Sequence, residues 1–222
     1  MPDNSALTRT QLKTPKAAAI AGIAFSLLMV AIFWLLRRSI PDDPLEIGAW
    51  LATDSKTVAF ALNLVPFAGV AFLWFIGVLR DRLGQEEDRF FASVFFGSAL
   101  LFLAMLFATA AVGGAVILLG SSVKADELIN SETFRFARAT AYIAMNVYAV
   151  KMAAVFMIST STLIIYTAIA PRWIALLGYL LAAGLLIGSY YIRWSFAVLP
   201  LWVFLLSIYI LLDNLGPQQK AE

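Results

Sequence analysis

The 222-residue chain contains no cysteine and no histidine. The missing cysteines exclude disulfides, thiolate metal sites and thiol nucleophiles. The missing histidines exclude haem ligation by histidine, histidine proton relays and the commonest zinc ligand sets. From these two absences we expect no metal centre and no cofactor.

Charged residues are scarce as well, at 14% of the chain against 62% hydrophobic residues. A soluble domain of this size would leave more apolar surface than it could bury, so lipid must cover the rest. The net charge of +2 comes from scattered residues and forms no basic patch that would neutralise a row of phosphates. We therefore expect a lipid bilayer as the first partner and no nucleic acid.

Catalytic patterns are also missing. The chain has no H-E-x-x-H, no P-loop, no G-x-G-x-x-G and no G-x-S-x-G. All fourteen carboxylates lie in loops, in tails or at the ends of apolar runs, whereas a proton-coupled carrier usually keeps an acid inside the membrane. We expect the protein not to be an enzyme.

Six apolar runs separated by short charged loops fill the chain instead. Each is long enough to cross a bilayer as a helix, which takes ~20 apolar residues. The loops are too short to fold separately, so residues 1–222 are expected to form one all-α domain, a polytopic bundle of six membrane-spanning helices. The expected helices cover residues 17–37, 57–80, 90–120, 132–170, 172–191 and 194–213.

The basic residues give the bundle an orientation. Arg37 and Arg38 follow the first run where a signal peptide would carry small residues, so we expect this run to be retained as a helix. Three basic residues precede it, and three arginines lie in the turn 80–89. Because basic residues favour the inner side, we expect both termini in the cytoplasm.

The segment FLWFIGVLRDRLG at 72–84, followed by EDRFF at 87–91, resembles uncharacterised bacterial six-helix integral membrane proteins. The resemblance covers the second and third helices. It implies a multi-pass protein of a bacterial inner membrane and carries over no activity and no site.

The third and fourth helices are longer than a bilayer needs. At 1.5 Å per residue, 90–120 and 132–170 exceed a ~30 Å hydrocarbon core, so apolar surface would stand outside on the outer side. Such surface is rarely left to water. We expect its cover to be either another protein chain or a short helix within 44–54 that presents Leu45, Ile47, Trp50 and Leu51.

Lys151 is the one ionisable residue inside an apolar run apart from the tyrosines. At 100° per residue, Tyr148, Lys151, Ser159, Thr162 and Tyr166 fall on one side of the fourth helix. This polar stripe predicts either an aqueous path or a contact with an anion or a lipid phosphate. The alternative is that Lys151 reaches the headgroups with its long stem while the hydroxyls bond to carbonyls of their own helix.

Proline and glycine mark further candidate positions. Pro66 and Pro200 lie inside the second and sixth helices and predict kinks or hinges, with Asn63 as the local partner of the carbonyl that Pro66 leaves unbonded. Small residues predict close helix packing at two places: Gly184 with Gly188 on the fifth helix, and Gly22 on the first. The glycine pair serves either packing within the bundle or dimerisation.

Two hypotheses of function follow. In the first, the protein is a non-enzymatic accessory or scaffold subunit that acts through contacts with a protein partner or as a homo-oligomer. In the second, it is a small channel or carrier for an anion or amphiphile, and the polar stripe of the fourth helix lines the path. The sequence favours the first and leaves the second open.

Overall fold

The computed structural model describes residues 14–40, 48–83, 89–188 and 194–213, and these residues contain helices and no strand. The long helices are α1 (Thr14–Ser39), α3 (Ser55–Leu83), α4 (Arg89–Gly120), α8 (Arg172–Gly188) and α9 (Ser195–Asp213). A further continuous helix consists of α6 (Glu132–Ile143), η1 (Ala144–Ala149) and α7 (Val150–Thr167). Two short helices, α2 (Trp50–Thr53) and α5 (Ala125–Ile129), lie in the connections. The all-α prediction is confirmed.

Five of the helices are long and apolar enough to cross a membrane: α1, α3, α4, the continuous helix 132–167, and α9. The predicted sixth span, 172–191, is a helix, but α8 has 17 described residues, about 26 Å, which is less than a ~30 Å core. Its predicted last residues, 189–191, lie outside the described part of the chain. The protein is therefore a membrane-embedded helix bundle with five candidate spans.

The predicted helix 132–170 needs two corrections. Its middle, Ala144–Ala149, is a π-helix rather than an α-helix. Its end is Thr167, because Ala168 adopts a left-handed conformation with φ of 52° and donates its N–H to the Ile164 carbonyl at 3.0 Å. Pro171 accounts for the early end, since the residue before a proline is disfavoured in the α conformation.

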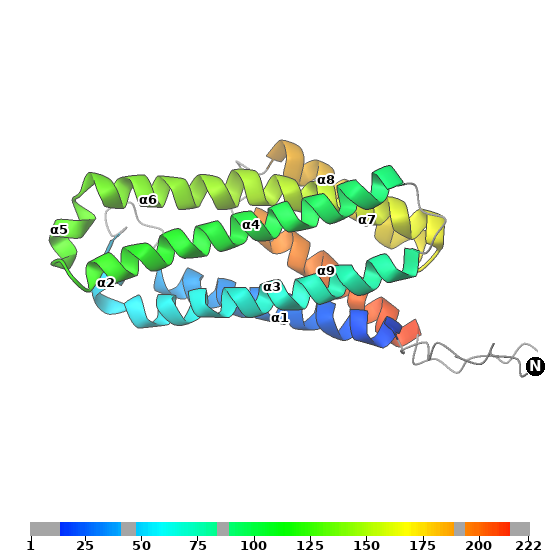
Figure 1. Ribbon diagram of the computed structural model, residues 1–222, viewed down its shortest axis with the longest axis horizontal. Coiled ribbons are helices and arrows are strands. Elements are labelled where there is room, and N and C mark those ends of the chain that lie inside the picture. Colours follow the sequence, from blue (N-terminus) through cyan, green and yellow to red (C-terminus); the bar gives the residue numbers. More distant parts are fainter. Residues whose placement is uncertain (1–13, 41–47, 84–88, 189–193, 214–222) are drawn as a thin grey trace, which may run out of the picture.

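Figure 1 shows how the helix lengths shape the bundle. The helices α1, α3, α4 and α6–η1–α7 run along the length of the molecule, whereas α8 and α9 accompany them only over the half that holds the start of α1. The short helices α2 and α5 lie at the opposite end. Described residues at the start of α1 and at the end of α9 lie at the same end of the bundle.

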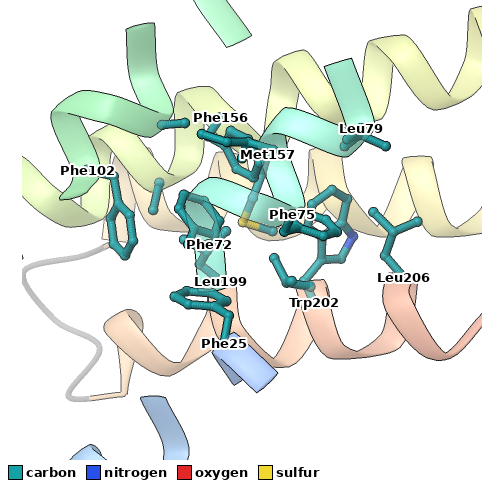
Figure 2. Close-up of a cluster of buried hydrophobic side chains, with 14 of the residues drawn as sticks. Phe25, Phe72, Phe75, Leu79, Phe102, Phe156, Met157, Leu199, Trp202 and Leu206 are labelled. Atoms are coloured by element: carbon teal, nitrogen blue, oxygen red, sulfur yellow. The ribbon is translucent and has the colours of Figure 1, made fainter. Parts of the chain in front are cut away.

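Aromatic rings form the centre of the bundle (Figure 2). Phe72 of α3 is fully buried, and its ring centroid lies 4.6 Å from that of Phe25, 5.2 Å from Phe156 and 5.5 Å from Phe102. Trp202 of α9 is buried beside them and donates its indole N–H to the Ile174 carbonyl at 3.2 Å. These contacts join α1, α3, α4, α7, α8 and α9 around one core.

A second, smaller core closes the end that carries α2 and α5. Trp50 and Leu51 of α2 are buried in one cluster with Val116 of α4 and Phe134 of α6. The Ser131 hydroxyl caps α6 by accepting the Phe134 N–H at 3.2 Å. Trp50 and Leu51 of the first loop thus cover the ends of α4 and α6, as one of the two predicted alternatives requires, while Leu45 and Ile47 lie outside the described residues. That this end faces the outer side of a membrane stays a prediction.

Candidate functional site

Adjoining apolar cavities lie where the long helices extend past the start of α9. One of them, the central cavity, has a volume of about 360 Å³ and lies between α1, α3, α4, η1 and the first turn of α9. An end cavity of about 330 Å³ continues it toward α2 and α6, and the two share Leu36, Ile40, Leu62 and Thr109 as lining. Volumes of this order match small-molecule sites in proteins, which are concave and mostly apolar.

Two grooves connect this space with the outside of the bundle. The α1–α9 groove, about 270 Å³, shares Met29, Phe33, Arg37 and Phe196 with the central cavity. The α3–α4 groove, about 450 Å³, shares Leu62, Val65 and Ala110 with it. Because shared residues separate neighbouring spaces, small side-chain movements would join them.

Three polar side chains line the central cavity. Its polar lining consists of Arg37 in the last turn of α1, Thr109 of α4 and Asn146 of η1. Thr109 donates its hydroxyl to the Met105 carbonyl at 2.9 Å, and Asn146 donates its amide to the Tyr142 carbonyl at 3.1 Å. Arg37 lies where a cation complements the carbonyl end of a helix.

The π-helix η1 supplies one wall of the central cavity through Met145 and Asn146. A π turn holds one residue more than an α turn and is found frequently at functional sites. Its presence here brings an amide side chain to the cavity from a run that is otherwise apolar. The central cavity combines a mostly apolar lining with a few polar groups, which suits an amphiphile better than a hydrated ion.

The predicted hinges lie beside these cavities. Pro66 and Asn63 line the α3–α4 groove, and Pro200 lines the α1–α9 groove. Each proline removes the N–H that would bond the carbonyl four residues earlier, and these carbonyls belong to Leu62 and Phe196. Both of those residues line the central cavity.

The expected role of Asn63 needs correction. Its side-chain amide donates to the Ala59 carbonyl at 2.9 Å, not to the Leu62 carbonyl that Pro66 leaves unbonded. Side chains on a helix lean toward its N-terminus while carbonyls point toward its C-terminus. Asn63 therefore reaches the carbonyl one turn before it.

The predicted polar stripe is placed on η1 and α7, and its members have different surroundings. Tyr148, Lys151 and Tyr166 are exposed, whereas Ser159 is buried and donates to the Val155 carbonyl at 3.0 Å. Thr162 lies against α8, because its hydroxyl is 2.6 Å from the Tyr179 hydroxyl as well as 2.9 Å from the Ile158 carbonyl.

None of these five residues lines the central cavity, the end cavity or either groove. The structure brings Ser159 and Thr162 into side-chain bonds with their own helix or with α8. A path along this stripe stays a prediction.

The glycines predicted to permit close helix packing also have different surroundings. At Gly22, a side chain would meet the Ser207 hydroxyl and lie 2.8 Å from the Phe75 ring, so α1 approaches α9 and α3 closely there. At Gly184 an added Cβ would meet nothing within 4 Å, and Gly188 is the last residue of α8. Gly22 therefore permits close helix packing within the described bundle, whereas Gly184 takes no part in such packing.

Sequence reasoning missed Arg37, Thr109 and Asn146 as a group. Asn146 carried a signal, because an amide inside an apolar run needs a partner. The π turn that directs it has no comparable signature in the sequence. Comparisons of the chain with protein-family models, with curated proteins and with solved structures found no match in any of the three. The resemblance to bacterial six-helix membrane proteins therefore stays a prediction.

Proposed function

We propose that the protein is a small non-enzymatic carrier that takes up a lipid-like amphiphile in the central cavity. The observation that supports it most is the adjoining set of mostly apolar cavities, with Arg37, Thr109 and Asn146 as polar lining residues of the central one. An amphiphile likewise combines a long apolar part with a few polar groups. This is the amphiphile alternative of the sequence analysis, with a different site in place of the helix stripe.

The proposed setting is a bacterial inner membrane with both termini in the cytoplasm. The end with α2 and α5 then faces outward, and the central cavity lies near the outer headgroups. Exposed tryptophans support this depth: Trp34 and Trp194 line the α1–α9 groove at the level of Arg37, and tryptophan is enriched at membrane interfaces.

The proposal is tested by filling part of the central cavity with a larger side chain. Ala110 of α4 lines both the central cavity and the α3–α4 groove, so Ala110→Leu places three more carbon atoms in the space that an acyl chain would occupy. We expect about tenfold weaker binding of a fluorescent phosphatidylcholine to the purified protein, and slower protein-dependent movement of that lipid between vesicle leaflets.

The matched control is Ala108→Leu, because Ala108 is exposed on the same helix and lines none of these cavities. It should bind and move the lipid as the parent protein does. Equal behaviour of both variants and the parent would contradict the proposal.

A second candidate is the accessory or scaffold subunit. Its support is the end of the bundle opposite the termini, where Leu118 of α4 and Phe136 of α6 are 72% and 75% exposed. Apolar side chains outside a membrane are typical of interfaces. The burial of α2 against Val116 and Phe134 weakens this candidate, because the chain covers part of the same end by itself.

A further inference from the structure

We infer that the central cavity and the end cavity together hold one acyl chain of the amphiphile, and that Phe134 and Trp50 at the far end set the greatest chain length that fits. This inference rests on the proposed function and adds the chemical class of the ligand and the limit on its size.

One side of the continuous helix 132–167 forms a wall along both cavities. Phe134, Ala137 and Ala141 line the end cavity, and Met145 of η1 lines the central cavity. Residues three and four apart share one side of an α-helix, so the first three form a row on α6 that η1 continues. The two cavities are therefore successive parts of one passage, which deepens from Met145 toward Phe134.

The side chains along this wall change from small to large. Ala137 and Ala141 are half-buried and leave space beside α6. Phe134 lies beyond them and is buried with Trp50 of α2 in the smaller core at this end of the bundle. A chain that enters from the central cavity meets these two rings at the far end.

The wall on α4 has the same order of sizes. Ala110 lines the central cavity, and Gly113 and Val116 line the end cavity one and two turns further on. A Cβ at Gly113 would lie 3.0 Å from a methyl carbon of Leu62 on α3. Small residues thus keep the middle of the passage open between α3, α4 and α6.

Length and volume select one acyl chain as the occupant. From Phe134 to Met145 the helix rises about 16 Å, which is about the length of one lipid tail, because two opposed tails fill a ~30 Å bilayer core. The cavities of about 360 and 330 Å³ hold about 12 and 11 methylene groups, if each takes the ~30 Å³ of a water molecule. One chain fits, and the second chain of a diacyl lipid would stay outside.

The experiment measures retention against chain length. The full-length protein in mild detergent is equilibrated with equal amounts of lysophosphatidylcholines that carry decanoyl to icosanoyl chains, and native mass spectrometry counts each retained lipid by its mass. We expect the highest retention for myristoyl and palmitoyl chains. Retention of the icosanoyl chain should be about tenfold lower, because its last carbons would overpack the closed end.

Two substitutions shorten the passage at different depths. Ala137→Leu adds three carbon atoms near the closed end and should move the highest retention to chains shorter by about three carbons. Ala141→Leu lies one turn nearer the central cavity and should move it further. The control is Ala139→Leu, because Ala139 is exposed on the same helix and lines none of the four spaces. This variant should keep the parent profile.

A second mixture distinguishes the sources of the chain. It contains phosphatidylcholines with two identical chains of the same lengths. The same length limit in both mixtures identifies one chain of a diacyl lipid as the occupant, whereas retention of the lysolipids alone identifies a single-chain amphiphile.

The outcomes separate the two proposals. Retention that does not depend on chain length, or equal profiles of Ala137→Leu, Ala141→Leu and the parent, would overturn the length limit and leave the carrier in place. If the parent retains no lipid of any length and Ala110→Leu changes nothing, the carrier itself fails.

Discussion

Gly22 and Gly184 are both glycines within apolar helices, yet their surroundings give them opposite roles. A Cβ at Gly22 would displace the Ser207 hydroxyl, which is buried and has no hydrogen-bond partner, and would press on the Phe75 ring. A Cβ at Gly184 would meet open space. One glycine permits close helix contact, and the other does not serve that purpose within the described bundle.

We expect Gly22→Ala to lower the free energy of unfolding by about 1 to 3 kcal/mol, because overpacking moves side chains and backbone. Gly184→Ala should leave it unchanged or raise it by up to ~1 kcal/mol, since alanine favours a helix. Apparent melting temperatures of both variants in the same detergent provide the comparison. If the two shifts agree in sign and size, the assigned roles are wrong.

Asn146 and Arg37 show why the candidate site could be predicted only in part. The sequence places Arg37 at a helix end and Asn146 in a long apolar run, and composition predicts the membrane around them. Their meeting in the central cavity depends on how α1, α4 and η1 pack, which depends on long-range contacts that a single sequence does not display. Lys151 stood out in the sequence for its charge, but its side chain is exposed.

At the scale of elements, α6 differs from the membrane helices around it. It carries Glu132 and Arg135, joined at 2.9 Å, on an exposed side and buries Phe134 on the other. Such a two-sided pattern is typical of a helix that lies against a protein core in water. The first part of the continuous helix 132–167 thus behaves as a cover for the end of α4.

Phe134 and Phe136 offer a matched pair on this helix, at 5% and 75% exposed. We expect Phe134→Ala to lower the free energy of unfolding by about 3 kcal/mol, because it leaves a cavity beside Trp50 and Val116. Phe136→Ala should change it by less than ~0.5 kcal/mol. Thermal unfolding in detergent measures the first effect.

Light scattering of Phe136→Ala addresses the accessory role. If the parent self-associates and Phe136→Ala does not, the exposed side of α6 is an interface. A parent that stays monomeric and keeps no partner through purification would count against the scaffold.

The apolar runs predicted which segments form helices, but they did not predict where every helix ends or where a helix departs from α geometry. The bounds of α4 agree with the prediction within one residue, because charged residues flank its run closely. The helix 132–167 ends before Ala168 and contains η1, and neither feature is visible in hydropathy. A wheel drawn at 100° per residue also misplaces Tyr148 relative to Lys151, since Tyr148 lies in the π segment.

At the scale of the whole molecule, the helices differ in length, and α9 is close to the ~30 Å thickness of a bilayer core. The continuous helix 132–167 is 36 residues long and α4 is 32, against 19 for α9. The excess lies at the end with α2 and α5. That end should therefore stand in water or among headgroups.

Because the chain contains no cysteine, a single introduced cysteine can report whether its position on α4 lies in water, with no labelling at other positions. Leu118→Cys and Leu101→Cys both replace exposed leucines of α4, about 26 Å apart along the helix. In vesicles, we expect a water-soluble maleimide to label the cysteine at 118 readily and the one at 101 hardly at all. Labelling at equal rates would show that α4 does not protrude as described.

The π turn has a consequence for how the chain tolerates changes of length. Within η1 the helix already accommodates one surplus residue, so losing a residue there would convert it to ordinary α-helix and leave both flanks in phase with their neighbours. The same loss inside α7 would turn every following side chain by about 100° and carry Met157 out of the core. A one-residue deletion within 144–149 should therefore be tolerated better than one in α7, and deleting Asn146 itself would remove its amide from the cavity wall while keeping the rest of the bundle.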